Sequence, residues 1–184
     1  MQENYVIIHG SFGSPFDNWF PWLARELKAQ NKSALVPDFP IGADLQTYDN
    51  WKNLLKYYCD LGYINETTTL IGHSIASIFI VKFLIESKIK VKKIILVAGF
   101  NNYSGPIPEI DYVNKTFFTN NISKIKNYCK EIVCAYSEND PYITIEVLEQ
   151  FAQEISTKTI VIPEGGHFNT DSDYNEFNEI LEEV

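Results

Sequence analysis

Short apolar runs and helical segments alternate along most of this 184-residue chain, and this alternation limits the possible folds more than any other feature of the sequence. Strands joined through helices lie parallel in one sheet, with right-handed crossovers. Such a sheet is covered on both faces, which explains why the runs are apolar throughout. We therefore expect an α/β fold: a three-layer α/β/α sandwich with a mostly parallel six-stranded sheet.

The pattern assigns a residue range to each element. Strands are predicted at residues 5–8, 34–36, 67–71, 93–97, 131–136 and 159–162, and helices at 21–30, 49–61, 75–86 and 144–155. The connection over residues 100–130 is long for a compact domain and therefore either has a function or contains its own helix. Because it is rich in aromatic residues, we expect a partial cap there with an apolar acyl pocket, although such residues more often belong to the core.

Composition favours one globular domain, residues 1–184, and disfavours a nucleic-acid partner. Hydrophobic residues make up 45% of the chain, enough for a sizeable core. The 15 basic and 24 acidic residues give a net charge of −9, and the sequence has no basic cluster to neutralise a phosphate backbone. Three cysteines without a CxxC spacing, Cys59, Cys129 and Cys134, argue against a disulfide framework and a zinc site.

The sequence also indicates where the protein is found. The first predicted strand begins close to Met1, and no apolar run reaches the roughly 18 residues that a membrane span requires. We expect a cytoplasmic protein with no membrane partner, as a monomer or a weak homodimer.

A serine lies where the third predicted strand meets the following helix, in Gly72-His73-Ser74-Ile75-Ala76. A sharp turn between a strand and a helix holds a hydroxyl clear of the backbone, where it can attack an acyl group. Ser74 is therefore a candidate nucleophile. In a second interpretation, Ser74 is only the N-cap of the helix.

A serine hydroxyl needs a histidine base, and the chain has three histidines. The side chain of His73 is expected to point away from its neighbour, and His9 belongs to the loop after the first strand. His167 follows the last strand and a glycine-rich loop, which places it at the same sheet edge as Ser74. It is the candidate base, although it could instead be a loop histidine on the surface.

The base needs an acid to orient it, and Asp140 follows the fifth predicted strand in Ser137-Glu138-Asn139-Asp140-Pro141. Asp140 could also merely begin the following helix, since Asp-Pro is common in turns. Asp38, which also follows a strand, is the alternative acid. The order Ser74, Asp140, His167 is that of the α/β-hydrolase triad.

In sequence order, these motifs resemble the α/β-hydrolases, specifically the small serine hydrolases related to retinoblastoma-binding protein nine and their YdeN-like bacterial relatives. The resemblance covers nearly the full length of the chain. It rests on residues 5–10, 19–23, 37–40, 71–74, 137–141 and 165–168. It implies a minimal α/β-hydrolase domain that lacks the first antiparallel strands and the large lid, with the triad at Ser74, Asp140 and His167. One position departs from the pattern, because Ala76 replaces the usual glycine two residues after the nucleophile.

The predicted mechanism needs backbone donors for a developing oxyanion. By position, the N–H of Ile75 supplies one, and the N–H of Ser11 or Phe12 supplies the other. Gly10 and Gly13 allow this loop to approach closely, and His9 orients it by hydrogen bonding.

The expected function is cleavage of small acyl substrates, which are esters, thioesters or amides, without a metal or an organic cofactor. A function of a different class remains open, namely a non-catalytic protein-interaction module on a hydrolase scaffold.

Overall fold

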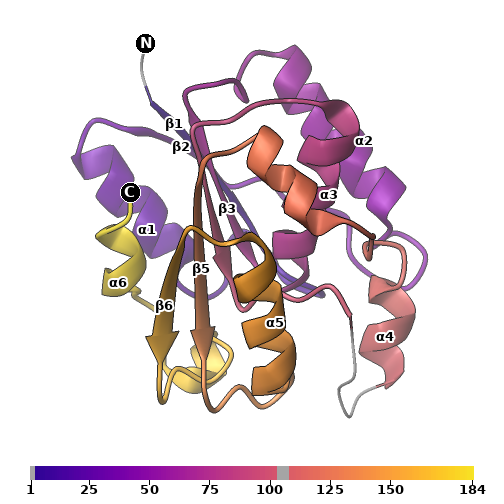
Figure 1. Ribbon diagram of the computed structural model, residues 1–184. Coiled ribbons are helices and arrows are strands. Elements are labelled where there is room, and N and C mark those ends of the chain that lie inside the picture. Colours follow the sequence, from indigo (N-terminus) through magenta and orange to yellow (C-terminus); the bar gives the residue numbers. More distant parts are fainter. Residues whose placement is uncertain (1–2, 103–107) are drawn as a thin grey trace.

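One parallel sheet forms the centre of the protein (Figure 1). The computed structural model describes residues 3–102 and 108–184. Its six strands are β1 (Asn4–Ile8), β2 (Ser33–Leu35), β3 (Thr68–His73), β4 (Lys93–Val97), β5 (Glu131–Ser137) and β6 (Lys158–Ile162). They pair in the order β2-β1-β3-β4-β5-β6, and each of these pairings is parallel. The predicted sheet is therefore confirmed, without antiparallel strands among the described residues.

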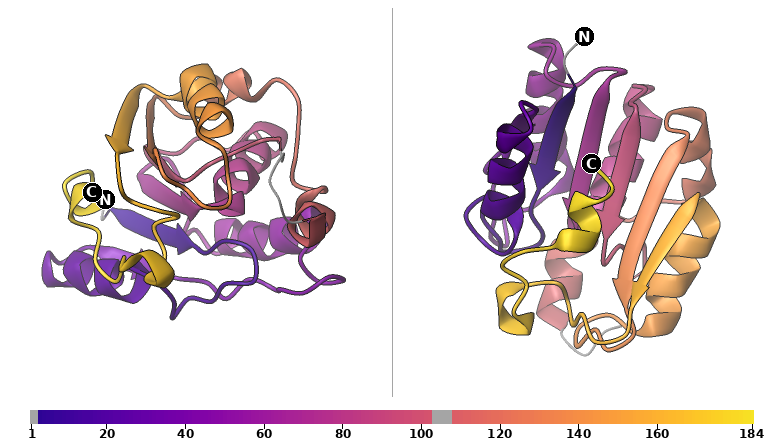
Figure 2. Two further views of the ribbon diagram at one scale, coloured as in Figure 1. Left: turned by 90° about the horizontal axis from the view of Figure 1, so that it is seen from below. Right: turned by 90° about the vertical axis from the view of Figure 1, so that its left-hand side faces the viewer.

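Helices cover both faces of this sheet (Figures 1 and 2). They are α1 (Phe20–Ala29), α2 (Tyr48–Asp60), α3 (Ile75–Ser87), α4 (Pro108–Asn114), α5 (Ile145–Ile155) and α6 (Asn178–Leu181), with 3-10 turns at Ile122–Asn127 and Thr170–Ser172. Helices α1 and α6 lie on one face, and α2, α3 and α5 lie on the other. The three-layer α/β/α sandwich is confirmed.

Local sequence signals explain where the helices begin and end. Pro21 lies in the first turn of α1, where a missing N–H is tolerated. At the start of α2, Thr47 Oγ1 accepts a hydrogen bond from the N–H of Asn50 (3.3 Å). Just beyond its end, Gly62 has φ +81°, a conformation that glycine adopts without steric cost.

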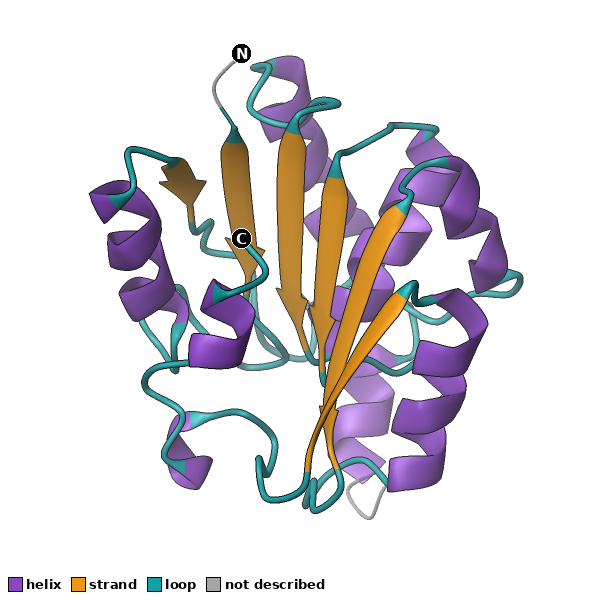
Figure 3. Ribbon diagram, turned by 60° about the vertical axis from the view of Figure 1, so that its left-hand side comes forward, coloured by secondary structure: helices purple, strands orange, loops and turns teal. Residues whose placement is uncertain are grey.

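The strands differ in how deeply they are buried. All six residues of β3 are buried, whereas β6 is an edge strand of exposed and half-buried residues. The carboxyl ends of the strands all point to the same edge of the sheet (Figure 3). Side chains that follow β1, β3, β5 and β6 can therefore meet there.

The sequence-based element boundaries are close to the observed ones. Helix α4 lies in the long connection, where a helix was one of the two expectations. Helix α6 was not predicted, because it has four residues with one buried side chain, Ile180, and therefore no periodicity to detect. Within residues 3–102 and 108–184, no helix combines the length and hydrophobicity needed to cross a bilayer.

Candidate active site

Ser74 occupies the sharp turn between β3 and α3. Its backbone has φ 58° and ψ −125°, and its N–H donates to the carbonyl of Val97 (2.8 Å). A non-glycine residue with positive φ is held there by its surroundings and is typical of functional sites. The Ser74 side chain does not cap any N–H of α3, so its interpretation as a helix N-cap is wrong.

The turn is tight because Gly72 brings β3 against α3. A Cβ at position 72 would lie 2.9 Å from the backbone C and O of Ala76 and 2.7 Å from Ile80 Cδ1. Close approach therefore depends on Gly72. Ala76, the departure from the family pattern, is fully buried at the start of α3.

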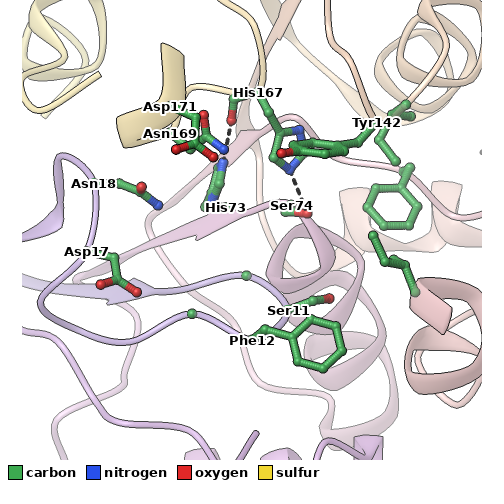
Figure 4. A pocket seen from close by; sticks show the side chains of 15 residues that line it. Ser11, Phe12, Asp17, Asn18, His73, Ser74, Tyr142, His167, Asn169 and Asp171 are labelled. Atoms are coloured by element: carbon green, nitrogen blue, oxygen red, sulfur yellow. Dashed lines mark hydrogen bonds between the residues drawn. The ribbon is translucent and has the colours of Figure 1, made fainter. Parts of the chain in front are cut away.

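His167 lies between Ser74 and Asp140. Its Nε2 is 3.1 Å from Ser74 Oγ, and its Nδ1 is 2.7 Å from Asp140 Oδ2. Figure 4 shows the imidazole above the serine. The carboxylate accepts from Nδ1–H, so Nε2 is left to accept a proton from the hydroxyl. The structure thus brings together the three side chains that the sequence analysis selected.

Asp140 makes hydrogen bonds that fit both of the roles considered for it, as an acid beside His167 and as the start of a turn. Oδ2 faces His167, whereas Oδ1 accepts hydrogen bonds from the N–H groups of Tyr142 (2.8 Å) and Ile143 (3.0 Å). One oxygen is thus hydrogen-bonded to the imidazole and the other to the turn before α5. The alternative acid, Asp38, is exposed and does not line the cavity next to Ser74.

The loop that carries His167, residues 165–168, is called the base loop here. Gly165 N–H donates to Ser137 Oγ (2.9 Å) and Gly166 N–H to Asn139 Oδ1 (2.7 Å). On the other side, Trp19 Nε1 donates to the carbonyl of Phe168 (3.0 Å). These hydrogen bonds hold the loop from two sides.

His73 also holds the base loop. Its Nε2 is 2.8 Å from the carbonyl oxygen of His167 (Figure 4), and a carbonyl can only accept, so Nε2 carries the hydrogen. Burial, followed by the proximity of the His167 ring, lowers the pKa of His73 to about 3. His73 is therefore neutral near pH 7 and points away from Ser74 Oγ, as the sequence analysis expected.

Residues 10–13 form a second loop beside Ser74, called the oxyanion loop here. Its approach depends on Gly10, since a Cβ there would lie 2.9 Å from Ser74 Cβ and 3.3 Å from the carbonyl of His73. Gly13 N–H donates to the carbonyl of Gly10 (3.3 Å) and closes the loop.

His9 orients this loop through one tautomer. Phe39 N–H donates to His9 Nε2 (3.0 Å), so the hydrogen is on Nδ1, which donates to the carbonyl of Gly10 (2.8 Å). Burial lowers the pKa of His9, which favours this neutral form. A planar trans peptide directs its C=O and N–H in opposite directions. Holding the Gly10 carbonyl therefore also fixes the direction of the Ser11 N–H.

Of the two oxyanion donors that the sequence left open, Phe12 is already engaged. Its N–H donates to Gln46 Oε1 (3.0 Å), and its backbone has φ 56°. Ser11 N–H is therefore the better candidate. The other donor, Ile75 N–H, belongs to the first residue of α3, where a helix leaves its N–H groups without intrahelical acceptors.

A cavity of about 400 Å³ opens over Ser74. Asp17, Asn18, Asn169 and Asp171 lie on one side of the serine, and Tyr142 lies on the other (Figure 4). Apolar contributions come from Phe12, Phe100, Ile110, Tyr142 and Ile143. The volume suits a small ligand.

The aromatic cap expected over residues 100–130 is described only in part. Tyr103 and Pro106 lie outside the described residues. Phe100 lines the cavity, but Phe117 is fully buried in the core and Tyr112 is 58% exposed. In the described part of this segment, the cavity lining therefore comes from Phe100 and Ile110.

Several residues near Ser74 were not predicted from the sequence. The Tyr142 ring packs edge-on against His167, with 5.0 Å between ring centroids. Gln46 and Asn114 lie far apart along the chain and meet behind the oxyanion loop. Tyr142 could have been noted from its position just after Asp140-Pro141, but the amides lie in no recognisable motif. Within the described residues, no three His, Cys, Asp or Glu side chains gather as a metal site would require.

Comparison with known proteins supports the same architecture. A sequence model of the family described as serine hydrolase matches residues 5–184. YdeN of Bacillus subtilis (strain 168) is 27% identical over 176 residues, which are 95% of this chain and 90% of that protein. The crystal structure of the B. subtilis ydeN gene product has a TM-score of 0.86 at 25% identity, covering 98% of this chain and 96% of that one.

A structure from a study of LipS and LipT, two metagenome-derived lipolytic enzymes, has a TM-score of 0.76 at 13% identity. The match covers 99% of this chain and 91% of that chain. At this identity the similarity concerns the fold alone.

Proposed function

Because this chain belongs to the serine hydrolase family, among the YdeN-like α/β-hydrolases, we propose that it is an esterase that cleaves small esters through Ser74, His167 and Asp140. Thioesters and amides are related substrates, since the same machinery acts on all three. The observation that carries the proposal is the position of the His167 ring, hydrogen-bonded to Ser74 Oγ on one side and to Asp140 Oδ2 on the other.

The first step is attack by Ser74 Oγ on the substrate carbonyl carbon. His167 Nε2 takes the hydroxyl proton, and Asp140 holds the ring tautomer and stabilises the imidazolium that forms. His167 then gives its proton to the leaving group as the C–O bond breaks, which leaves an acyl-enzyme on Ser74. Water, activated by the same histidine, hydrolyses this ester and regenerates the serine.

The carbonyl oxygen becomes negatively charged in this step and needs donors that are already in place. Ile75 N–H and Ser11 N–H supply them. Ile75 N–H lies at the N-terminus of α3, where the helix dipole also favours negative charge. Removing one such donor typically costs on the order of 10²–10³ in rate.

The cavity supports a small acyl substrate. Ile110, Phe100 and Ile143 provide apolar surface for the acyl group. A volume of about 400 Å³ lies near the lower limit for ligand sites and favours short acyl chains over long ones.

Kinetics on p-nitrophenyl esters of increasing chain length test the proposal. The wild-type protein should hydrolyse the short esters, a fluorophosphonate probe should modify Ser74, and Ser74→Ala should abolish both reactions. Ser77→Ala is the matched control, because Ser77 is also a buried serine, lies in the first turn of α3 and does not line the cavity. Full activity of Ser74→Ala, or labelling of another residue, would show that the proposed mechanism is wrong.

The same experiment distinguishes an enzyme from a non-catalytic interaction module. An acyl-enzyme intermediate gives a burst of p-nitrophenol when deacylation is slower than acylation. A pure binding module gives neither a burst nor turnover.

A further inference from the structure

Two buried amide side chains, Gln46 and Asn114, connect the oxyanion loop to helix α4. Gln46 is 1% exposed and Asn114 is fully buried. Phe12 N–H donates to Gln46 Oε1 (3.0 Å), and Gln46 Nε2 donates to Asn114 Oδ1 (3.0 Å). The same Asn114 oxygen accepts from Ser11 Oγ (2.8 Å).

The backbone determines how both amides are oriented. A peptide N–H can only donate, so the Phe12 N–H requires the oxygen of Gln46 on its side. The Gln46 NH₂ then faces Asn114, which requires the oxygen of Asn114 on that side. The hydrogen-bonding network therefore has one consistent direction, from the Phe12 peptide to the end of α4.

This network holds Ser11 at two points. Asn114 holds its hydroxyl, and Gln46 holds the Ser11–Phe12 peptide through the Phe12 N–H. His9 already holds the carbonyl of the preceding peptide. The proposed donor, Ser11 N–H, thus lies between two anchored groups and has little freedom to turn away from Ser74.

Stability alone does not account for an asparagine at position 114. Within the described part of the chain, its Nδ2 is buried and has no hydrogen-bond partner. Leaving a buried donor unpaired destabilises the folded state. The side chain thus provides an acceptor for the oxyanion loop at the expense of an unpaired donor.

Helix α4 also contributes Ile110 to the cavity wall. The same seven-residue helix therefore lines the cavity through Ile110 and contacts the oxyanion loop through Asn114.

We propose that Asn114 and Gln46 are positioning residues that set the geometry of the oxyanion loop and link it to the acyl-binding wall on α4. This inference rests on the proposed function, because it concerns a donor used in ester hydrolysis. Neither amide lines the cavity or contacts the reacting atoms. Their effect is exerted through Ser11 and Phe12, so it should appear in kcat rather than in KM.

The most direct test is Ser11→Ala, which removes the anchored hydroxyl but keeps the Ser11 N–H. Ser11 is only half-buried, so the variant is expected to fold. On a short p-nitrophenyl ester, kcat should fall about tenfold with little change in KM, because the donor is misplaced rather than lost. Asn114→Ala should lower kcat about 10–100-fold, since Gln46 also loses its acceptor.

Two further variants separate positioning from general damage. Asn114→Asp keeps an oxygen acceptor at the same place and should recover most of the kcat lost in Asn114→Ala. Asn101→Ala is the matched control: Asn101 also makes two amide hydrogen bonds in the 100–130 segment, to Thr119, but it does not contact the oxyanion loop. It should lower the melting temperature while keeping kcat.

A trifluoromethyl ketone provides a second measurement, because serine adds to it to form a tetrahedral oxyanion. Its affinity should fall in Ser11→Ala and Asn114→Ala by about the same factor as kcat. If Ser11→Ala and Asn114→Ala both keep wild-type kcat and inhibitor affinity, the inference is wrong. It is also wrong if Asn114→Ala lowers kcat no more than Asn101→Ala does. If Asn114→Ala fails to fold, Ser11→Ala alone decides. Absence of turnover in the wild-type protein would instead disprove the proposed function.

Discussion

The two loops beside Ser74 differ in the strand that precedes them and in the residues that hold them. The oxyanion loop follows β1, an interior strand whose last four residues are buried. The base loop follows β6, an edge strand with one neighbour and no fully buried residue. Nevertheless, His167 is only 8% exposed. The sheet alone cannot fix the base, so hydrogen bonds to the loop must do so.

The partners of each loop show what this difference means. The base loop is held by Ser137 and Asn139, at and just after the end of β5, by His73 at the end of β3, and by Trp19 just before α1. Three of these four residues neighbour Asp140 or Ser74, so the base shares most of its support with the acid and the nucleophile. The oxyanion loop is held by Gln46 and Asn114, which come from segments without a triad residue. The triad and the oxyanion donors should therefore respond to different mutations.

Among changes to the residues around the two loops, Asp140→Asn, beside the base His167, should have the largest effect on kcat. The remaining Oδ1 can still accept from Tyr142 and Ile143, so the turn should persist. An amide NH₂ in place of Oδ2 would face His167 Nδ1 and favour the tautomer with the hydrogen on Nε2, which cannot accept a proton from Ser74. We expect kcat to fall by about 10³–10⁴-fold with a nearly unchanged melting temperature.

Asp38→Asn is the control for this variant, because Asp38 also follows a strand but does not line the cavity. It should keep wild-type kcat. A loss in Asp140→Asn smaller than tenfold would mean that Asp140 does not determine the tautomer of His167.

The next largest effect on activity is expected in the oxyanion loop, for Gly10→Ala. Its new Cβ would lie 2.9 Å from Ser74 Cβ and 3.3 Å from the carbonyl of His73, so the loop must retreat from the nucleophile. We expect kcat/KM to fall by about 10–100-fold. Gly13→Ala, in the same loop, makes its closest contact at 3.3 Å with the carbonyl of Gly10 and should lose less than about tenfold. Equal losses in both variants would argue against close approach of Gly10 to Ser74 as the cause.

A smaller effect tests the hydrogen bonds that support the base loop. Ser137→Ala removes the acceptor of Gly165 N–H, and both residues are buried. The unpaired donor should lower the free energy of unfolding by about 1–3 kcal/mol, measured by urea denaturation. In the control, Ser77→Ala, only a donor to the carbonyls of Gly72 and Val97 is lost, and Val97 also accepts from Ser74 N–H. Ser77→Ala should lower the free energy of unfolding by about 1 kcal/mol or less. A larger loss in the control would contradict this account.

The two loops also differ in how far the sequence predicts them. The strand pattern and the motifs around Ser74, Asp140 and His167 were sufficient to predict that these three side chains lie at one edge of the sheet, because the carboxyl ends of parallel strands meet there. His9, which directly follows β1, contacts the loop that it was expected to orient, through the carbonyl of Gly10. The positions of these side chains could be predicted because each lies in the segment that follows a strand, at the edge where the carboxyl ends of the strands meet.

The remaining features depend on tertiary contacts that leave no local pattern. Gln46 and Asn114 are 68 residues apart, and their hydrogen bond cannot be inferred from the residues around either one. Phe117, an aromatic residue of the 100–130 segment, packs against Trp51 and Phe79 in the core, which is the alternative that the sequence left open for such residues. Aromatic content alone cannot distinguish a cavity wall from a core.

The last expected effect is a dependence of the free energy of unfolding on pH, which we attribute to His73. Its pKa is about 3 in the folded protein because of burial, against an ordinary value near 6.5. Between these values the unfolded chain binds a proton that the folded protein does not, so stability falls as the pH falls below about 6.5. This group contributes a slope of at most about 1.4 kcal/mol per pH unit.

His73→Gln removes this titration while keeping an amide donor for the carbonyl of His167. Urea unfolding at a series of pH values from 8 to about 4.5 should give a shallower decline for the variant than for the wild type. The carboxylates and His9 contribute to both curves, so they largely cancel in the difference. Parallel curves would mean that the folded and unfolded states of the wild type take up the His73 proton at the same pH, so that burial does not lower the pKa of His73. The hydrogen bond from Nε2 to the His167 carbonyl would remain, since both protonation states can donate it, but the base loop would then be anchored by a charged imidazole below about pH 6.5.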